Sequence, residues 1–264
     1  MEKKEHQRLV QQEFTLQAER FAQNAVLSRD QELQLIVEAA RIAPGERVLD
    51  VACGTGLLTF AAAHRGAAVT GLDLTEAMLQ VARQSLARAS QAGRGLAGVT
   101  FQRGDAGALP FADRSFDAVI TRLSVHHFPD PSLPLREMAR VCKAGGRVVV
   151  ADIVAAEDPP RRNLHNQIER LRDPSHVAFL SKRQLRELLE GAGLAWARTA
   201  DWSTPRGLKE WTAITGFRPE VLPELEHLMR RAIPDDAAGI QAGLGPDGEP
   251  RFTHHWTVAV AERR

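Results

Sequence analysis

The sequence predicts an α/β domain built on a mostly parallel sheet, and three features of its patterning support this. Short apolar runs alternate with helical patterns through the first 154 residues, which is typical of a parallel sheet with helices on both faces. The apolar runs lack polar alternation, so neither face of the sheet is expected to be wet. The stretch VLDVACGTGLLTF, Val48–Phe60, predicts a buried strand, a glycine turn and the start of a helix. That order is typical of a nucleotide-binding α/β domain.

The expected elements follow in chain order, and Gly and Pro mark several of their ends. Amphipathic residues 5–28 predict one or two helices, and Pro44-Gly45 ends the helix after them. Gly145-Gly146 is expected to stop the helix before the fifth strand. The expected strands are Arg47–Ala52, Ala68–Asp73, Val99–Gly104, Phe116–Leu123, Arg147–Val154, Leu194–Trp202 and Arg251–Ala261. The expected helices between them are Gln31–Ile42, Gly56–His64, Thr75–Ala89, Pro131–Cys142 and one that starts at Ser181, where Gln184 completes a capping box.

Two stretches interrupt this alternation and are expected to be helical insertions within a single domain, 1–264. Residues 157–180 are polar and helical in pattern, and residues 205–240 show little alternation. The glycine- and proline-rich turn GLGPDGEP precedes the last strand, which suggests that this strand runs antiparallel at the sheet edge.

Composition and charge exclude several classes of function. Hydrophobic residues make up 44% of the 264 residues and charged residues 25%, as in ordinary soluble globular proteins. Lysine and arginine number 34 against 33 acids, so no strong field favours nucleic acid or a membrane. No apolar run approaches the roughly 18 residues of a membrane span, and the N-terminus lacks the apolar core of a signal peptide. Cys53 and Cys142 lie in apolar contexts, which fits a reduced cytoplasmic protein.

The glycine turn and the strand ends favour an adenosine ligand without phosphates. Gly54 and Gly56 allow the backbone to turn sharply and to approach a ligand closely. Thr59, however, stands where a dinucleotide fingerprint has its third small residue, and no Walker-type lysine follows. Asp73 ends the second strand, where a carboxylate can bind both ribose hydroxyls, and Asp105 ends the third, where it can accept from an adenine amino group. S-adenosylmethionine is the ligand that these features favour.

The chain resembles a class I S-adenosylmethionine-dependent methyltransferase, and especially the small-molecule branch of the ubiquinone and menaquinone C-methyltransferases. Five segments keep that family's order and spacing: VLDVACGTG, GLDLTEAML, GDAGALPFADRSFDAVI, SVHHFPDP and LREMARVCKAGGRVVVADI. The resemblance implies a Rossmann-like seven-stranded sheet of order 3-2-1-4-5-7-6 with strand 7 antiparallel. It also implies a lid from helices within 1–30, a cofactor-binding core at 46–155, and insertions that cover the substrate.

The resemblance further implies roles for single residues. Asp50 and the glycine turn should meet the methionine half of S-adenosylmethionine, and Asp73 the ribose. Leu74 and Met78 should flank the adenine, and Gln17, Phe21 and Asn24 are lid candidates. The residues expected to bind the cofactor are Phe21, Asp50, Ala52, Cys53, Gly54, Gly56, Asp73, Leu74, Met78, Gly104, Asp105, Ala106, Thr121, Arg122 and Leu123.

Two histidines are candidates for catalysis. Methyl transfer from a sulfonium is an in-line displacement in which the enzyme mostly supplies alignment, and a base is needed only if the acceptor arrives protonated. His126 is preferred to His127 as that base, because SVHHF starts the loop that faces the site; the alternative is that the pair only shapes the loop. His176 is expected to touch the substrate, unless Asp173 and Ser175 simply make a helix-initiating turn there.

We therefore expect a cytoplasmic enzyme that converts S-adenosylmethionine to S-adenosylhomocysteine while methylating O, N or C of a small molecule. Nucleic-acid and membrane partners are not expected, and a homodimer stays open. No metal is expected, because the histidines form no recognised ligand pattern. Alternation should place His254 and His255 on opposite faces of the last strand. A repurposed S-adenosylmethionine binder (a cyclase or a sensor) and a dinucleotide-dependent oxidoreductase remain as alternatives.

Overall fold

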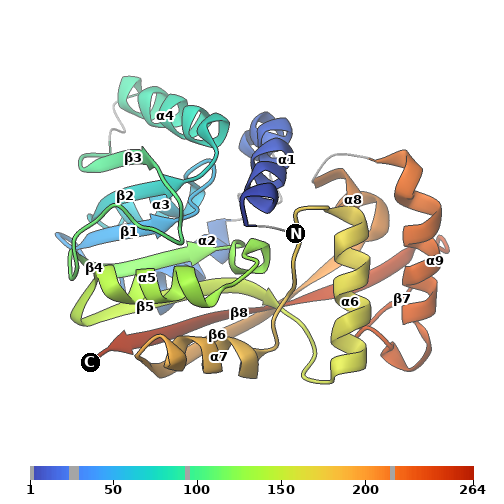
Figure 1. The fold of residues 1–264 in the computed structure, drawn as a ribbon. Helices are drawn as coiled ribbons and strands as arrows, with labels where there is room; N and C mark the ends of the chain where they lie inside the picture. Colours follow the sequence, from blue (N-terminus) through green and yellow to red (C-terminus); the bar gives the residue numbers. More distant parts are fainter. Residues whose placement is uncertain (1–2, 24–29, 93–95, 215–217) are drawn as a thin grey trace.

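The computed structural model describes residues 3–23, 30–92, 96–214 and 218–264, and its centre is one twisted sheet (Figure 1). The strand order is β3-β2-β1-β4-β5-β8-β6, with β7 paired to β8. Strands β1 to β5 pair in parallel, whereas β8 is antiparallel to β5, β6 and β7. The strands are β1 Arg47–Val51, β2 Ala68–Asp73, β3 Val99–Arg103, β4 Phe116–Arg122, β5 Cys142–Val154, β6 Leu194–Gly207, β7 Gly243–Leu244 and β8 Pro250–Arg263. The order predicted from the resemblance is confirmed, with β8 as its seventh strand and the short β7 added.

Helices cover both faces of the sheet, as the apolar strands require (Figure 1). The helices α5 and α7 pack on one face, while α2 and α3 pack on the other. The α-helices are α1 Lys3–Gln23, α2 Asp30–Ala39, α3 Leu57–Ala63, α4 Glu76–Gln91, α5 Ser132–Val141, α6 Pro159–Arg172, α7 Lys182–Gly191, α8 Leu208–Ile214 and α9 Leu222–Ala232. Three short 3₁₀ turns are η1 Val125–His127, η2 Pro219–Val221 and η3 Pro234–Asp236. The capping box predicted at Ser181 is present at the start of α7.

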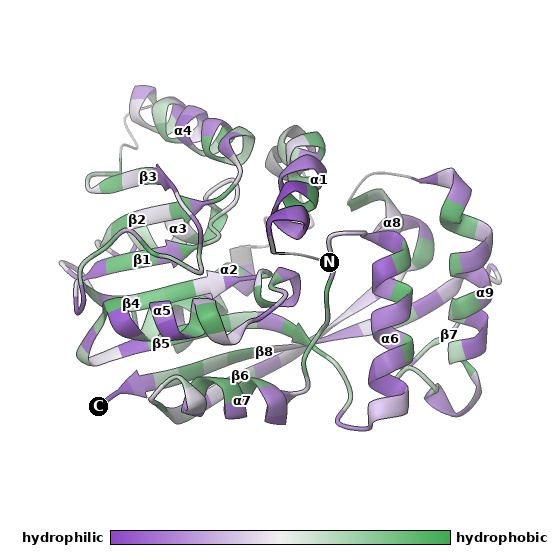
Figure 2. Ribbon diagram, viewed as in Figure 1, coloured by the Kyte–Doolittle hydropathy of each residue, from purple (hydrophilic) through white to green (hydrophobic). Residues whose placement is uncertain are grey.

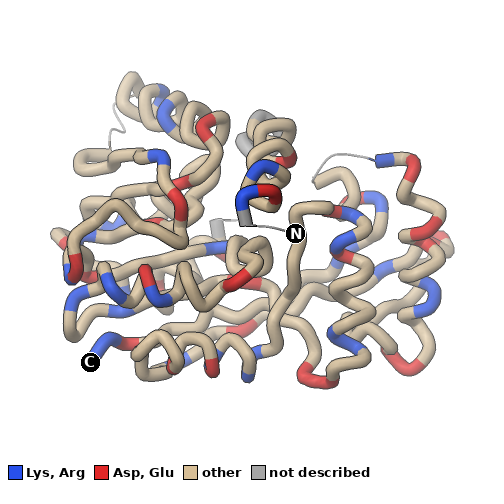
Figure 3. Tube along the Cα trace, viewed as in Figure 1, with Lys and Arg blue, Asp and Glu red and all other residues tan. Residues whose placement is uncertain are grey.

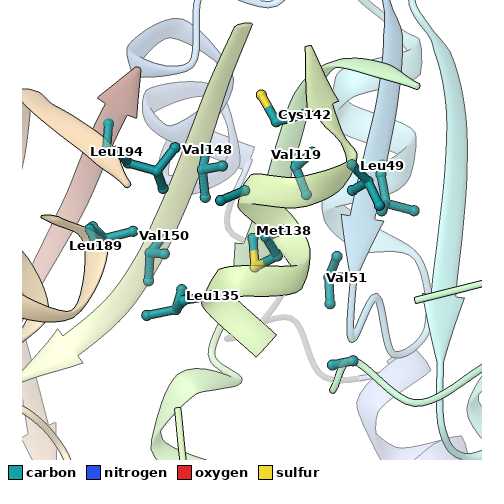
Figure 4. Packing of buried hydrophobic residues seen from close by; sticks show 14 of the residues in the cluster. Leu49, Val51, Val119, Leu135, Met138, Cys142, Val148, Val150, Leu189 and Leu194 are labelled. Atoms are coloured by element: carbon teal, nitrogen blue, oxygen red, sulfur yellow. The ribbon is translucent and has the colours of Figure 1, made fainter. Parts of the chain in front are cut away.

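The apolar side chains of α5 pack against apolar side chains of the sheet in one core (Figure 4). Leu135 and Met138 lie on the buried side of α5 and are fully excluded from solvent. They pack with Val119 and Val148 of adjacent strands and with Leu189 of α7 in one apolar cluster. Burial of one such side chain contributes roughly 1.5–3 kcal/mol. This packing fixes β4 and β5, whose carboxyl ends carry part of the site described below.

A separate apolar cluster lies beyond the end of the main sheet, where α6, α8 and α9 stand together (Figure 1). Figure 2 shows that α6 and α9 carry both polar and apolar residues, and their apolar sides meet around Trp211 and Phe252. Leu57, at the start of α3, and Leu123, just after β4, pack against the same cluster. The two helical insertions therefore pack against the residues that follow β1 and β4.

Two of the expected strand boundaries are wrong, and the sheet pairing explains both. Strand β5 begins at Cys142 rather than Arg147, because the Gly145-Gly146 pair lies within the strand at a register shift against β4 instead of ending a helix. Strand β6 continues through Pro205–Gly207, which was expected to be helical, by pairing with Arg251–Thr253 of β8. Proline is tolerated there because β6 is the edge strand, whose outer side needs no backbone N–H donor.

The distribution of charged and apolar residues over the elements agrees with the near-zero net charge and with the lack of a long apolar run in the sequence. Figure 3 shows lysine and arginine interspersed with acidic residues on most elements rather than gathered at one end of the molecule. Among the helices that the structure describes, none is both long and apolar enough to cross a membrane.

Candidate active site

A cavity of about 260 Å³ lies where the carboxyl ends of β1, β2, β3 and β4 meet beneath α1. This is the edge at which open parallel sheets bind ligands. The residues that line it are His6, Gln7, Val10, Phe14, Asp50, Ala52, Cys53, Gly54, Thr55, Leu57, Leu58, Leu72, Asp73, Leu74, Thr75, Met78, Gly104, Asp105, Ala106, Gly107, Arg122, Leu123, Ser124, His127, Phe128, Pro129, Asp130, Leu133 and Pro134.

The turn after β1 is held in a conformation that few side chains tolerate. Ala52, Gly54 and Gly56 all have positive φ, at 56°, 54° and 85°. Asp73 stabilises this turn from the end of β2: one carboxylate oxygen accepts from the Gly54 N–H at 2.8 Å, and the other accepts from the Thr75 N–H at 2.8 Å. A Cβ added to Gly54 would meet no atom within 4 Å, so open space lies beside the backbone there. The turn and Asp73 therefore form one preorganised unit at the cavity.

Burial controls the protonation of the acidic groups on this side. Burial raises the pKa of Asp50 to about 7, with a further contribution from the neighbouring Asp73 carboxylate and an opposing hydrogen bond from Thr59. The Thr59 hydroxyl donates to Asp50 at 2.6 Å. Burial also raises the pKa of Asp73, against the backbone hydrogen bonds that lower it. Cys53 has a pKa well above its usual range, because it is buried beside these two carboxylates, so its thiol stays neutral.

Helix α1 forms the outer wall of the cavity through residues of its first three turns. The Gln7 side-chain amide donates to Asp105 at 2.8 Å, and the Gln11 amide donates to the Leu74 carbonyl at 3.2 Å. The His6 Nε2 lies 2.8 Å from the His127 carbonyl oxygen, which can only accept, so Nε2 is the donor. Phe14 packs edge-on against the ring of His127, with ring centroids 5.0 Å apart. A helix from residues 1–30 thus covers the site.

The lid residues named from the sequence are not the ones that line the described cavity wall. Gln17 is buried but does not line the cavity. The side chain of Phe21 and the whole of Asn24 lie outside the described residues. The residues of α1 that do line the cavity carry no local sequence signal beyond amphipathicity, because which turn of a helix docks on a site depends on the tertiary arrangement.

His127 is the histidine of the SVHHF segment that lines the cavity. Its Nδ1 lies 3.0 Å from the Ser175 carbonyl oxygen, an acceptor, so Nδ1 carries the proton and Nε2 keeps its lone pair. The Ser175 hydroxyl lies 3.2 Å from the same Nδ1 and donates to Asp173 at 2.6 Å. Burial and, to a lesser extent, the neighbouring His126 together lower the pKa of His127 to about 4. The imidazole is therefore neutral at pH 7.

His126 and His176, the predicted catalytic residues, lie outside this cavity. The His126 Nδ1 lies 2.7 Å from Asp152 Oδ1, and the Val125 N–H donates to the other oxygen of Asp152 at 3.0 Å. Asp152, on β5, therefore holds η1 in place, and the His126 ring packs against Phe179. The His176 Nε2 is paired with Asn166 Oδ1 at 2.8 Å, and burial lowers the pKa of His176 strongly. Neither ring lines the cavity, so a catalytic role for either residue stays a prediction.

Most of the residues expected to bind the cofactor come together at the cavity. Gly56 and Thr121 are the exceptions among those whose side chains are described. Gly56 lies at the start of α3 with φ 85°, and the Thr121 hydroxyl donates to the Val51 carbonyl at 2.6 Å. Both residues therefore lie behind those that line the cavity. Arg122 and Leu123 do line the cavity, and Leu123 has a positive φ of 52°. Strained residues of this kind cluster at functional sites.

Comparison with known proteins identifies the family. A model of the methyltransferase domain family matches residues 42–193. The uncharacterized methyltransferase YcgJ of Bacillus subtilis is 34% identical over 198 residues, which cover 75% of this chain and 76% of that protein. A demethylmenaquinone methyltransferase of Clavibacter sepedonicus is 34% identical over 229 residues, 85% of either chain.

Solved structures agree with this assignment. The crystal structure of YcgJ superposes with a TM-score of 0.81 at 29% identity, and covers 89% of this chain and 99% of that one. A putative methyltransferase from Bacillus halodurans superposes with a TM-score of 0.80 at 28% identity, and covers 88% and 99%. The chain belongs to the methyltransferase domain family and is a class I S-adenosylmethionine-dependent methyltransferase.

Proposed function

We propose that this methyltransferase acts on a small, largely apolar acceptor that binds beside His127, with S-adenosylmethionine held by the strand ends. The observation that carries this proposal is the composition of the cavity. It combines three carboxylates at the strand ends, an apolar wall and the neutral imidazole of His127. A nucleic-acid acceptor finds no support in a chain with 34 basic and 33 acidic residues.

The donor set of the cavity fits S-adenosylmethionine better than a phosphorylated nucleotide. Asp50 suits the ammonium of the methionine half, Asp73 the ribose hydroxyls and Asp105 the adenine amino group. Three carboxylates on one wall would repel a pyrophosphate. When bound, S-adenosylmethionine supplies an electrophilic methyl group on a sulfonium centre. Gln7 now donates to the Asp105 carboxylate as an adenine amino group would, so α1 must adjust or share that carboxylate when the cofactor binds.

The far side of the cavity suits an apolar acceptor. Its wall is formed by side chains of α1, α3, α5 and the loop after β4, namely Val10, Phe14, Leu57, Leu123, Phe128, Leu133 and Pro134. The relative from Clavibacter sepedonicus is named for demethylmenaquinone, which supports an aromatic acceptor that carries an apolar substituent. The insertions 157–180 and 205–240 contribute indirectly, through Ser175 and through the cluster behind Leu57 and Leu123.

His127 is positioned to remove a proton from such an acceptor. Its Nε2 lone pair would take the proton of a phenol, enol or acidic carbon as the acceptor bonds to the methyl carbon, whose bond to the sulfonium sulfur would break to leave S-adenosylhomocysteine. The Nδ1–H stays bonded to the Ser175 carbonyl, and Asp173 nearby stabilises the positive charge of the imidazolium. The imidazolium then returns the proton to water, which restores the neutral ring.

Calorimetric titration of the purified protein tests the proposal, with S-adenosylhomocysteine in one series and NAD in another. We expect one S-adenosylhomocysteine per chain at micromolar affinity and no heat with NAD. A screen of phenols, quinols and aliphatic amines with labelled S-adenosylmethionine then identifies the acceptor, and label should enter the apolar aromatic compounds. Binding without label transfer to any class would favour the repurposed binder, and binding of NAD alone would overturn the assignment.

The protonation of Asp50 predicts a pH dependence of cofactor binding. Because its pKa is raised to about 7 and an ammonium pairs only with the ionised carboxylate, affinity should fall as the pH drops below 7. The fall should approach tenfold per pH unit, about 1.4 kcal/mol. Calorimetry at pH 6 in two buffers of different ionisation heat should show release of up to one proton on binding. In Asp50→Asn the affinity should be low and nearly constant from pH 5.5 to 8; an unchanged pH dependence in that variant would contradict the role of Asp50.

A further inference from the structure

A second cluster of titratable side chains lies away from the cavity, between α6 and β8. His165 and Glu169 are one helical turn apart on α6, and His254 faces them from β8. All three are buried, with exposed fractions of 1%, 0% and 3%. No metal site is expected here from the sequence, because the histidines form no recognised ligand pattern. The fold brings His254 to a histidine–glutamate pair that is distant in sequence.

The distances within this cluster suit a single small cation. The His254 Nε2 lies 2.9 Å from Glu169 Oε1, and the His165 Nε2 lies 3.7 Å from the same oxygen. One ligand atom from each residue lies within 4.8 Å of the other two. Ligands about 2.0–2.2 Å from a tetrahedral zinc ion stand roughly 3.3–3.5 Å apart, so only small adjustments are needed to close the shell.

His165 is the residue that a purely hydrogen-bonded network does not explain. Both of its ring nitrogens are buried, and neither has a hydrogen-bond partner within the described ranges. At 3.7 Å, Nε2 is too far from Glu169 for a hydrogen bond. A buried polar atom without a partner costs about 1–3 kcal/mol, so such groups usually serve a purpose. Coordination by Nε2 would satisfy one of these atoms at the centre of the cluster.

We propose that His165, Glu169 and His254 form a binding site for one divalent transition-metal ion of the zinc class. Two imidazoles and one carboxylate are the ligands that zinc prefers when it keeps a fourth position for water or hydroxide. The ion would join α6 to β8, and so tie the helical layer around Trp211 to the sheet. The site is distinct from the cofactor cavity, since none of the three residues lines it.

Arg172 limits how tightly the ion can be held. Its Nη2 lies 3.1 Å from Glu169 Oε2, and its guanidinium stacks on Trp211 at 4.6 Å. The arginine thus takes the oxygen that faces away from the histidines and orients the carboxylate, as outer partners of metal ligands commonly do. Its positive charge also opposes a divalent cation, which favours an ion that carries hydroxide in the fourth position. We therefore expect micromolar rather than picomolar affinity.

Metal titration of the untagged, chelator-treated protein tests this proposal. Zn²⁺ is measured by competition with a chromophoric chelator, both on the native protein and after refolding with Zn²⁺, because a fully buried site can load slowly. We expect one ion per chain with a micromolar Kd and a higher Tm with the metal. Co²⁺ should give intense visible bands typical of four or five ligands. Loading below a tenth of an ion per chain by both routes, or only the weak bands of hydrated Co²⁺, would overturn the site.

Three variants assign the ligands. His165→Gln and His254→Gln should each weaken Zn²⁺ binding by about 100-fold or more, since even loss of an outer partner costs 10–100-fold. His255→Gln is the matched control: this neighbouring imidazole bonds to the Ser203 hydroxyl at 3.0 Å instead, and the variant should bind like the wild type. Equal affinity in His165→Gln and the wild type would refute the proposal. If the ligand variants do not fold, the Co²⁺ spectrum of the wild type decides.

Discussion

Replacement of His127 with glutamine is expected to lower the turnover of methyl transfer by about 10²–10⁴-fold, the usual contribution of a positioned base. Glutamine keeps a donor for the Ser175 carbonyl and much of the volume beneath Phe14, but it has no lone pair of comparable basicity. The affinity for S-adenosylhomocysteine should change by only a few-fold, because the cofactor contacts proposed here come from β1, β2 and β3. Single-turnover kinetics with the acceptor from the screen, together with calorimetry, measure both quantities.

The pH profile of the same reaction separates a base from a residue that only shapes the loop. With a pKa lowered to about 4, His127 remains neutral down to that pH and becomes protonated below it. Wild-type turnover at saturating cofactor should therefore fall on the acid side near pH 4, and this limb should be missing in His127→Gln. His255→Gln again serves as the control for loss of an imidazole. Full turnover in His127→Gln, with loss in His126→Gln, would return the role to the residue preferred from the sequence.

The sequence predicted the core of the fold because its signals there are local. Each of β1 to β4 is a short apolar run bounded by turn residues, and the observed strands match the expected ones within a residue at each end. The continuation of β6 through Pro205 could not be predicted in this way. Its strand conformation depends on pairing with β8, about fifty residues later, and on the edge position that spares proline an N–H partner.

In the candidate site, too, the sequence could place residues that have a local signal but not those that depend on tertiary contacts. Asp50, Asp73 and Asp105 could be placed because each lies within two residues of the end of a strand, and parallel strands bring their carboxyl ends to one edge. The sequence favoured His126 over His127, because no local signal shows that Asp152 bonds to the ring of His126 while Ser175 bonds to the ring of His127, which lines the cavity. Asp152 was a usable signal nonetheless: it is the one acidic residue in the apolar run of β5, and a buried carboxylate needs a partner.

Replacement of Asp73 with alanine is the second large effect, and it acts on binding rather than on turnover. The affinity for S-adenosylhomocysteine should fall by one to two orders of magnitude, or roughly 1.5–3 kcal/mol, for the loss of hydrogen bonds to a charged group. Two effects contribute. The ribose hydroxyls would lose their acceptor, and the backbone N–H groups of Gly54 and Thr75, each 2.8 Å from this carboxylate, would lose theirs. Without these two hydrogen bonds, the left-handed conformation of the glycine turn would be less stable.

A control at the opposite end of the sheet distinguishes loss of the ligand contact from general weakening of the fold. Asp117 also accepts a backbone N–H, from Arg47 at 2.9 Å, and pairs with Lys143, but it lies at the amino end of β4 away from the cavity. Asp117→Ala should therefore lower the free energy of unfolding and leave calorimetric affinity unchanged. Asp73→Asn refines the comparison, because an amide keeps one acceptor oxygen but places its NH₂ against one of the two N–H donors; its affinity should lie between those of alanine and the wild type. Wild-type affinity in a folded Asp73→Ala protein would remove this carboxylate from the ribose, and the ribose hydroxyls would then have to be bound by another group of the cavity.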